Sequence, residues 1–82
     1  MEHVAIDLGS RESQVCRRDS QGKILESLRV KTAQLERYLE TRKQKPARVI
    51  LETCSEAFHL ADVSMKLGYE VRVVPATLVK SL

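Results

Sequence analysis

The 82-residue chain has no tryptophan, a single phenylalanine, three glycines and two prolines. Because aromatic residues are so scarce while 43% of the residues are hydrophobic, the core must be mainly aliphatic, which is typical of a Val/Ile/Leu-rich sheet with packed helices. The scarcity of glycine and proline excludes a linker-like stretch, so one small domain is predicted over residues 1–82. A domain of this size buries only about 60–65% of its unfolded surface, and we expect marginal stability.

Cysteine is also scarce, and its spacing excludes the common metal motifs. Cys16 and Cys54 form neither a CxxC nor a CxxH pair, and no signal-peptide pattern opens the chain. We therefore expect both to be reduced thiols that serve packing in a cytoplasmic protein. The longest apolar runs are far too short to span a bilayer, so no membrane partner is expected.

Neither sign of charge is in strong excess. Fourteen Lys and Arg against eleven Asp and Glu give a formal charge of +3, which permits contact with nucleic acid without requiring it. The basic residues do cluster locally, and the candidate phosphate contacts are Arg17, Arg18, Arg42, Lys43 and Lys45. The alternative is that these residues are ordinary solvated surface of helices and loops.

The hydrophobic pattern predicts the element order βββαβαβ. The strands are expected over residues 3–8, 13–18, 23–30, 47–52 and 69–74. The first three form an antiparallel meander, with a four-residue turn at 19–22 between the second and the third. The last two strands are joined through helices, which makes them parallel by the right-handed crossover rule. The fold class is therefore α/β with a mixed five-stranded sheet.

Two helices are predicted between these strands. Thr32 is the expected N-cap of the first, which must stop before Pro46. Ser55 is the expected cap of the second, and Gly68 ends it as the C′ residue. Residues 76–82 begin like a third helix.

Two carboxylates end matching apolar runs. Asp7 follows the run 4–6, and Glu52 follows the run 49–51. A residue at the carboxyl end of a buried strand lies where open α/β sheets place their ligands. If the fourth strand lies beside the first, the two acids meet and form half of a metal site. The alternatives are that Asp7 merely forms a turn and that Glu52 is favoured by the dipole of the following helix.

The sequence AIDLGS at residues 5–10, followed by a meander, and LET at 51–53 resemble the DEDD-type insertion-sequence transposases. The catalytic core of that family is similar to the Holliday-junction resolvase RuvC. The turn GYEV at 68–71 is also similar to the family, and the resemblance covers essentially the whole chain. It implies an RNase H-like fold whose carboxyl-terminal part is absent.

The resemblance further implies a function. Asp7 and Glu52 would be catalytic ligands of Mg²⁺ or Mn²⁺ in a two-metal site for DNA cleavage and strand transfer. The partner would be the DNA of insertion-element ends, with a structured RNA guide in some relatives. The family completes its site with two aspartates from a more carboxyl-terminal segment, so residues 1–82 are expected to be the amino-terminal part of the domain and inactive alone.

Two other function classes compete with this interpretation. The actin, Hsp70 and sugar-kinase ATPases share the opening Ile-Asp-x-Gly-Ser, in which the acid coordinates a metal and the turn grips nucleotide phosphates. A non-catalytic remnant would instead bind nucleic acid or associate with itself, because a sheet that lacks its last helix exposes apolar area. This exposed area predicts dimerisation, and a homo-oligomer is expected.

Overall fold

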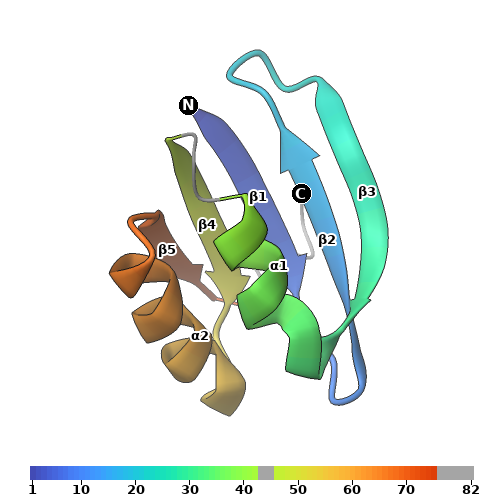
Figure 1. Ribbon diagram of the computed structural model, residues 1–82, viewed down its shortest axis with the longest axis vertical. Helices are drawn as coiled ribbons and strands as arrows, with labels where there is room; N and C mark the ends of the chain where they lie inside the picture. Colours follow the sequence, from blue (N-terminus) through green and yellow to red (C-terminus); the bar gives the residue numbers. More distant parts are fainter. Residues whose placement is uncertain (43–45, 76–82) are drawn as a thin grey trace.

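The computed structural model describes residues 1–42 and 46–75. These residues form one mixed sheet of five strands in the order β3-β2-β1-β4-β5, with two α-helices and a short 3₁₀ turn (Figure 1). The elements are β1 (Glu2–Asp7), β2 (Glu12–Arg18), β3 (Ile24–Lys31), η1 (Thr32–Gln34), α1 (Leu35–Thr41), β4 (Ala47–Glu52), α2 (Ser55–Lys66) and β5 (Glu70–Val74). The predicted α/β class and mixed five-stranded sheet are confirmed.

The pairing directions follow from the connections. Strands β1, β2 and β3 are antiparallel neighbours, and β4 and β5, which are reached through helices, run parallel to β1 and to each other. In the β2–β3 turn, the backbone carbonyl of Asp19 accepts a hydrogen bond from the backbone N–H of Gly22 at 3.0 Å, and Gly22 has φ +86°. That left-handed conformation carries little strain only for glycine, which explains the turn.

The helix ends differ in part from the sequence prediction. Thr32 is not the N-cap of α1, because it opens η1 and its hydroxyl donates to the carbonyl of Gly9 at 2.7 Å. The N-cap position of α2 falls on Cys54, one residue before the predicted Ser55. Gly68 follows α2 with φ +95°, as predicted for a C′ residue. The expected helix over 76–82 lies outside the described residues.

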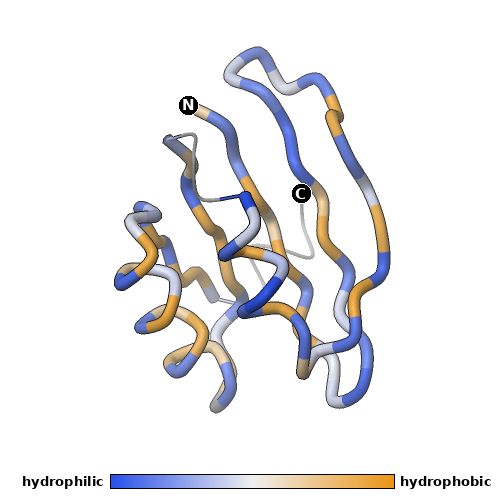
Figure 2. The backbone as a smooth tube through the Cα atoms, viewed as in Figure 1, coloured by the Kyte–Doolittle hydropathy of each residue, from blue (hydrophilic) through white to orange (hydrophobic). Residues whose placement is uncertain are grey.

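Both helices cover one face of the sheet and enclose an aliphatic core with it. Apolar residues recur along β1, β4 and α2 (Figure 2). The buried core side chains of the sheet and helices include Val4, Ile6, Val15, Val49, Leu51, Leu35, Leu39, Leu60 and Ala57. The intervening strand residues, such as Ala5 and Ile50, lie on the other face, which no described element covers.

The structure bears on two further expectations, the packing role of the cysteines and the shortness of the apolar segments. Cys16 and Cys54 are free thiols and half-buried, and Cys54 packs against the core. Neither described helix is long and apolar enough to cross a membrane. The expected packing role of Cys54 is therefore consistent with its contacts.

Candidate metal and nucleic-acid site

Asp7 and Glu52 lie beside each other at one edge of the sheet. The parallel register of β1 and β4 pairs Ile6 with Leu51, and one further step along both strands brings Asp7 to Glu52. Because Ile6 and Leu51 are buried under the helices, the next residues point to the opposite face. Asp7 is exposed and Glu52 is half-buried. The structure thus brings together the two acids that the sequence singled out.

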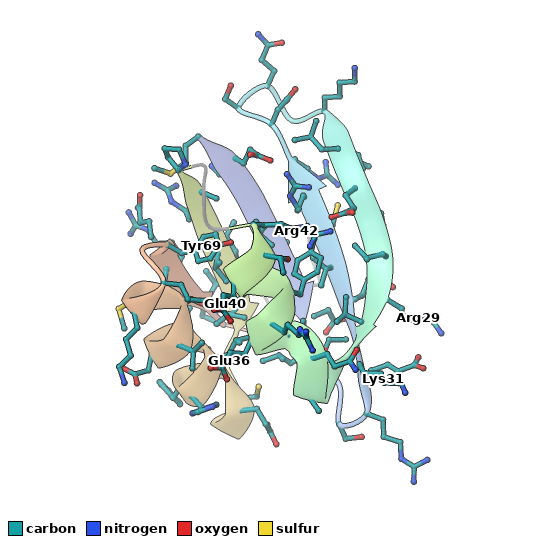
Figure 3. All side chains as sticks on the ribbon, in the orientation of Figure 1. Arg29, Lys31, Glu36, Glu40, Arg42 and Tyr69 are labelled. Carbon is teal, nitrogen blue, oxygen red and sulfur yellow. The ribbon has the colours of Figure 1, made fainter. Side chains whose placement is uncertain are left out.

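The row that contains these acids extends across the meander. Asp7 is the partner of Gln14 on β2, and Gln14 is the partner of Arg29 on β3. The open face therefore carries a cation on β3, an amide on β2 and carboxylates on β1 and β4, side by side across the sheet. Figure 3 shows Arg29 projecting from β3 at the outer side of the sheet.

A hollow of about 420 Å³ lies over the part of this row that belongs to β1, β2 and β3. Its lining residues are Asp7, Leu8, Gly9, Glu12, Ser13, Gln14 and Arg29. The guanidinium of Arg29 lies 3.7 Å from the carboxylate of Glu12, an exposed ion pair of small energetic weight. Sequence reasoning missed Glu12, Gln14 and Arg29, although the register of the meander would have placed Gln14 beside Asp7 and Arg29 beside Gln14.

The turn that follows Asp7 is held by buried hydroxyl groups. The backbone N–H of Gly9 donates to Ser13 Oγ at 3.2 Å, and the hydroxyl of Thr32 donates to the Gly9 carbonyl at 2.7 Å. The hydroxyls of Ser13 and Thr32 lie 2.8 Å apart, and because Thr32 uses its proton on Gly9, Ser13 is the donor between them. Ser13 is buried, so this network fixes the path of the chain just beyond Asp7.

The residue after Glu52 is anchored in a similar way. Both the backbone N–H and the hydroxyl of Thr53 donate to the carbonyl of Val74, at 2.8 and 2.9 Å. These bonds tie the end of β4 to the end of β5. The backbone that follows each of the two acids is therefore fixed by hydrogen bonds.

The donor set suits a hard divalent cation but is incomplete. Carboxylate oxygens are the ligands that Mg²⁺ and Mn²⁺ prefer. Among the described residues, no group of three or more His, Cys, Asp or Glu side chains is arranged to hold a metal ion. Two carboxylates alone bind Mg²⁺ weakly, because this ion requires a nearly ideal octahedral shell.

The three predicted phosphate contacts that the structure describes, Arg17, Arg18 and Arg42, do not form one surface. Arg17 lies on the helix-covered face, in ion pairs with Glu2 and, at 3.3 Å, with Glu26. Arg42 is 3.3 Å from Glu26 and stacks over the ring of Tyr38 at 4.0 Å. Arg18 is exposed on the open face, on the same side as Asp7. Lys43 and Lys45 lie outside the described residues.

The charges of Arg17 and Arg42 are used within the fold. The hydroxyl of Tyr38 donates to Glu26 at 2.6 Å, and this hydrogen bond, with those from the two arginines, lowers the pKa of the Glu26 carboxyl. Burial, together with the negative charge of Glu26, raises the pKa of the Tyr38 hydroxyl. This network joins β1, β2, β3 and α1, which favours a structural role for Arg17 and Arg42.

Replacing Glu26 by glutamine is expected to destabilise the domain by about 1–2 kcal/mol at pH 7, because two arginines and Tyr38 lose their charged acceptor. A carboxyl whose pKa is lowered in the fold stabilises it above the unfolded pKa of about 4.3. That contribution is lost as the pH falls through the folded pKa. The difference between wild type and Glu26→Gln should therefore shrink on acidification.

Urea unfolding followed by circular dichroism at pH 7 and at pH 3 measures this difference. The matched control is Glu40→Gln, which removes an exposed carboxylate near the carboxyl end of α1, the end that precedes Arg42. A Glu26→Gln variant as stable as the control at pH 7 would contradict the structural role of the network.

The chain matches no protein-family model and no curated protein. The function must therefore be inferred from the placement of Asp7, Glu52 and their neighbours. The geometry offers two adjacent carboxylates on an open sheet face, beside a hollow with a cation at its outer side.

Proposed function

We propose that the chain is the amino-terminal part of an RNase H-like catalytic domain of a DEDD-type transposase or site-specific recombinase. The observation that supports it is the parallel register of β1 and β4, in which Ile6 pairs with Leu51, so that Asp7 and Glu52 follow at the carboxyl ends of neighbouring strands. A fourth strand next to the first is the layout that the resemblance implies. The same resemblance gives both acids the role of metal ligands.

The proposed reaction is metal-dependent cleavage and transfer of DNA strands. Two Mg²⁺ or Mn²⁺ ions, when bound, activate the attacking oxygen and stabilise the leaving oxygen of a phosphodiester. Asp7 and Glu52 would hold the ions, and the two aspartates that the resemblance implies from a more carboxyl-terminal segment would complete the ligand set. Residues 1–82 alone then show no turnover.

The proposed partner is insertion-element DNA, with a structured RNA in some relatives. On the open face, Arg18 and Arg48 lie on either side of His3 in one row of the sheet, away from the acids. Such residues position phosphates rather than read bases. Arg48 also pairs with Glu70 at 2.8 Å, so Arg18 is the stronger candidate of the two.

Divalent-metal binding tests the proposal directly. In a titration with Mn²⁺ followed by NMR, we expect line broadening centred on the amides around Asp7 and Glu52. Asp7→Asn and Glu52→Gln should each remove it, because neither amide replaces a carboxylate ligand. The control is Asp62→Asn, an exposed acid on α2 that pairs with Lys66.

Other results of the titration would favour one of the two competing functions. Broadening that is absent, or that survives Asp7→Asn, contradicts the metal site and favours the nucleic-acid-binding remnant. Added ATP that shifts the resonances of Gly9 and Ser10 would favour the ATPase lobe, in which the turn after Asp7 binds phosphates.

A further inference from the structure

Strand β5 has an outer edge with no partner among the described residues, where β5 pairs with β4 alone. The carbonyl of Val74 accepts from Thr53 at the end of β4, so the backbone groups of Val74 face inward. Since these groups alternate in direction along a strand, Val71 and Val73 direct their N–H and C=O groups to the outer edge. Such an edge is a template for another strand.

Exposed apolar side chains lie next to this edge. Phe58 is 65% exposed, Met65 58% and Val73 37%. Phe58 and Met65 are seven residues apart and therefore share one stripe of α2. The stripe lies on the flank of α2 away from α1, because His59 and Val63 on the other flank line a groove with α1. Helix α2 packs on β4 and β5, so the stripe borders the outer edge of the sheet.

We propose that a second copy of this chain pairs with β5 in antiparallel orientation, around a two-fold axis at Val71. The result is a continuous sheet of ten strands. In this register Val71 faces Val71 of the partner subunit as a hydrogen-bonded pair, and Glu70 faces Arg72 of the partner subunit. The inference goes beyond the proposed function and does not depend on the metal site.

Charge selects this register over its neighbours. An axis at Arg72 would place the two arginines opposite each other, and an axis at Glu70 would do the same with the two carboxylates. An axis at Val73 would leave Arg72 opposite Val74. Glu70 already contacts Arg48 at 2.8 Å and Arg72 of its own chain at 3.5 Å, but both contacts use the same carboxylate oxygen, and the other oxygen can accept from the arginine of a second copy.

The helices fit the same arrangement. A two-fold axis perpendicular to the sheet keeps both copies of α2 on one face. Strands lie about 4.8 Å apart, so two helices that each sit over β4 and β5 come within roughly 10 Å, the usual distance of packed helices. Phe58 and Met65 then fill the seam between the two α2 helices and are no longer exposed to water.

The opposite edge of the sheet lacks this complementarity. On the open face of β3, Arg29 and Lys31 are both cations, and the acid of this strand, Glu26, lies on the other face. Self-pairing of β3 would therefore bring no acid opposite these cations. Charged residues of one sign are a common protection of sheet edges.

Two oppositely charged variants test the register. Arg72→Glu and Glu70→Arg each place like charges across the axis, so we expect each to weaken dimerisation about tenfold or more in sedimentation equilibrium. An equimolar mixture should form a heterodimer as tight as the wild-type dimer, because every pair is complementary again. The control Arg29→Glu, on the β3 edge, should leave dimerisation unchanged.

Phe58→Glu provides a second test with little risk to folding, since this side chain is mostly exposed. It should weaken the dimer without changing the circular dichroism spectrum. A wild-type chain that stays monomeric at millimolar concentration overturns the proposal. So does a dimer that is unaffected by Phe58→Glu and Arg72→Glu, which would assign the contact to the open sheet face instead.

Discussion

Replacing Leu51 by alanine is expected to cost about 2–5 kcal/mol of folding free energy, and so to unfold a large part of the population. Leu51 is 0% exposed and lies in the interior strand β4, between β1 and β5 and under the helices. A domain of this length has only about 4–12 kcal/mol of stability in total. The cavity left by the missing methyl groups cannot be refilled, because neighbouring strands are fixed by the sheet.

Urea unfolding monitored by circular dichroism measures this cost. The matched control is Ile50→Ala, its neighbour on β4, which faces the open side and is only half-buried. It should cost less than half as much. Equal losses at the two positions would contradict the assignment of the core to one face of the sheet.

The second large effect is expected for Gly9→Ala, with a loss of about 3 kcal/mol. A Cβ atom at residue 9 would lie 2.1 Å from the carbonyl oxygen of Glu12, a backbone atom that cannot move aside alone. The turn after Asp7 must then open. This movement breaks the hydrogen bonds of Gly9 with Ser13 and Thr32 and displaces the acid pair.

Gly22→Ala is the matched control for this substitution. Gly22 has φ +86° but no atom within 4 Å of an added Cβ, so the variant carries only the cost of the left-handed conformation, about 1–2 kcal/mol. NMR shifts around Asp7 should change in Gly9→Ala and stay constant in Gly22→Ala. A stable Gly9→Ala variant with unchanged shifts would contradict the close approach of Gly9 to the Glu12 carbonyl.

The proposed metal site and the proposed dimer occupy different parts of the sheet. Asp7 and Glu52 lie at the carboxyl ends of β1 and β4 on the open face, whereas the β5 contact extends the sheet in its plane, with Glu70 and Arg72 on the open face of the edge strand and Phe58 and Met65 on the helix-covered face. Dimerisation therefore leaves the open face accessible to nucleic acid. Loss of either property by mutation can be measured without loss of the other.

The sequence by itself determined the strand and helix order and the position of the two acids. Alternation and apolar runs predict all five strands, and Gly22 and Gly68 mark chain reversals that need positive φ. These features are local, since each depends on residues close in the chain. The adjacency of Asp7 and Glu52 needed one assumption, that β4 lies beside β1, and the register satisfies it.

Only the tertiary structure decided how the polar side chains are used. Thr32 looks like a helix cap, but the meander brings Gly9 and Ser13 to its hydroxyl. Arg17 looks like a phosphate contact, but Glu2 and Glu26 from neighbouring strands surround it. The partners of Thr32 lie 23 and 19 residues away in the chain and those of Arg17 lie 15 and 9 residues away, so they become neighbours only through strand pairing. Because a polar group binds whichever partner the register brings within about 3 Å, its role follows from the fold and not from the local sequence.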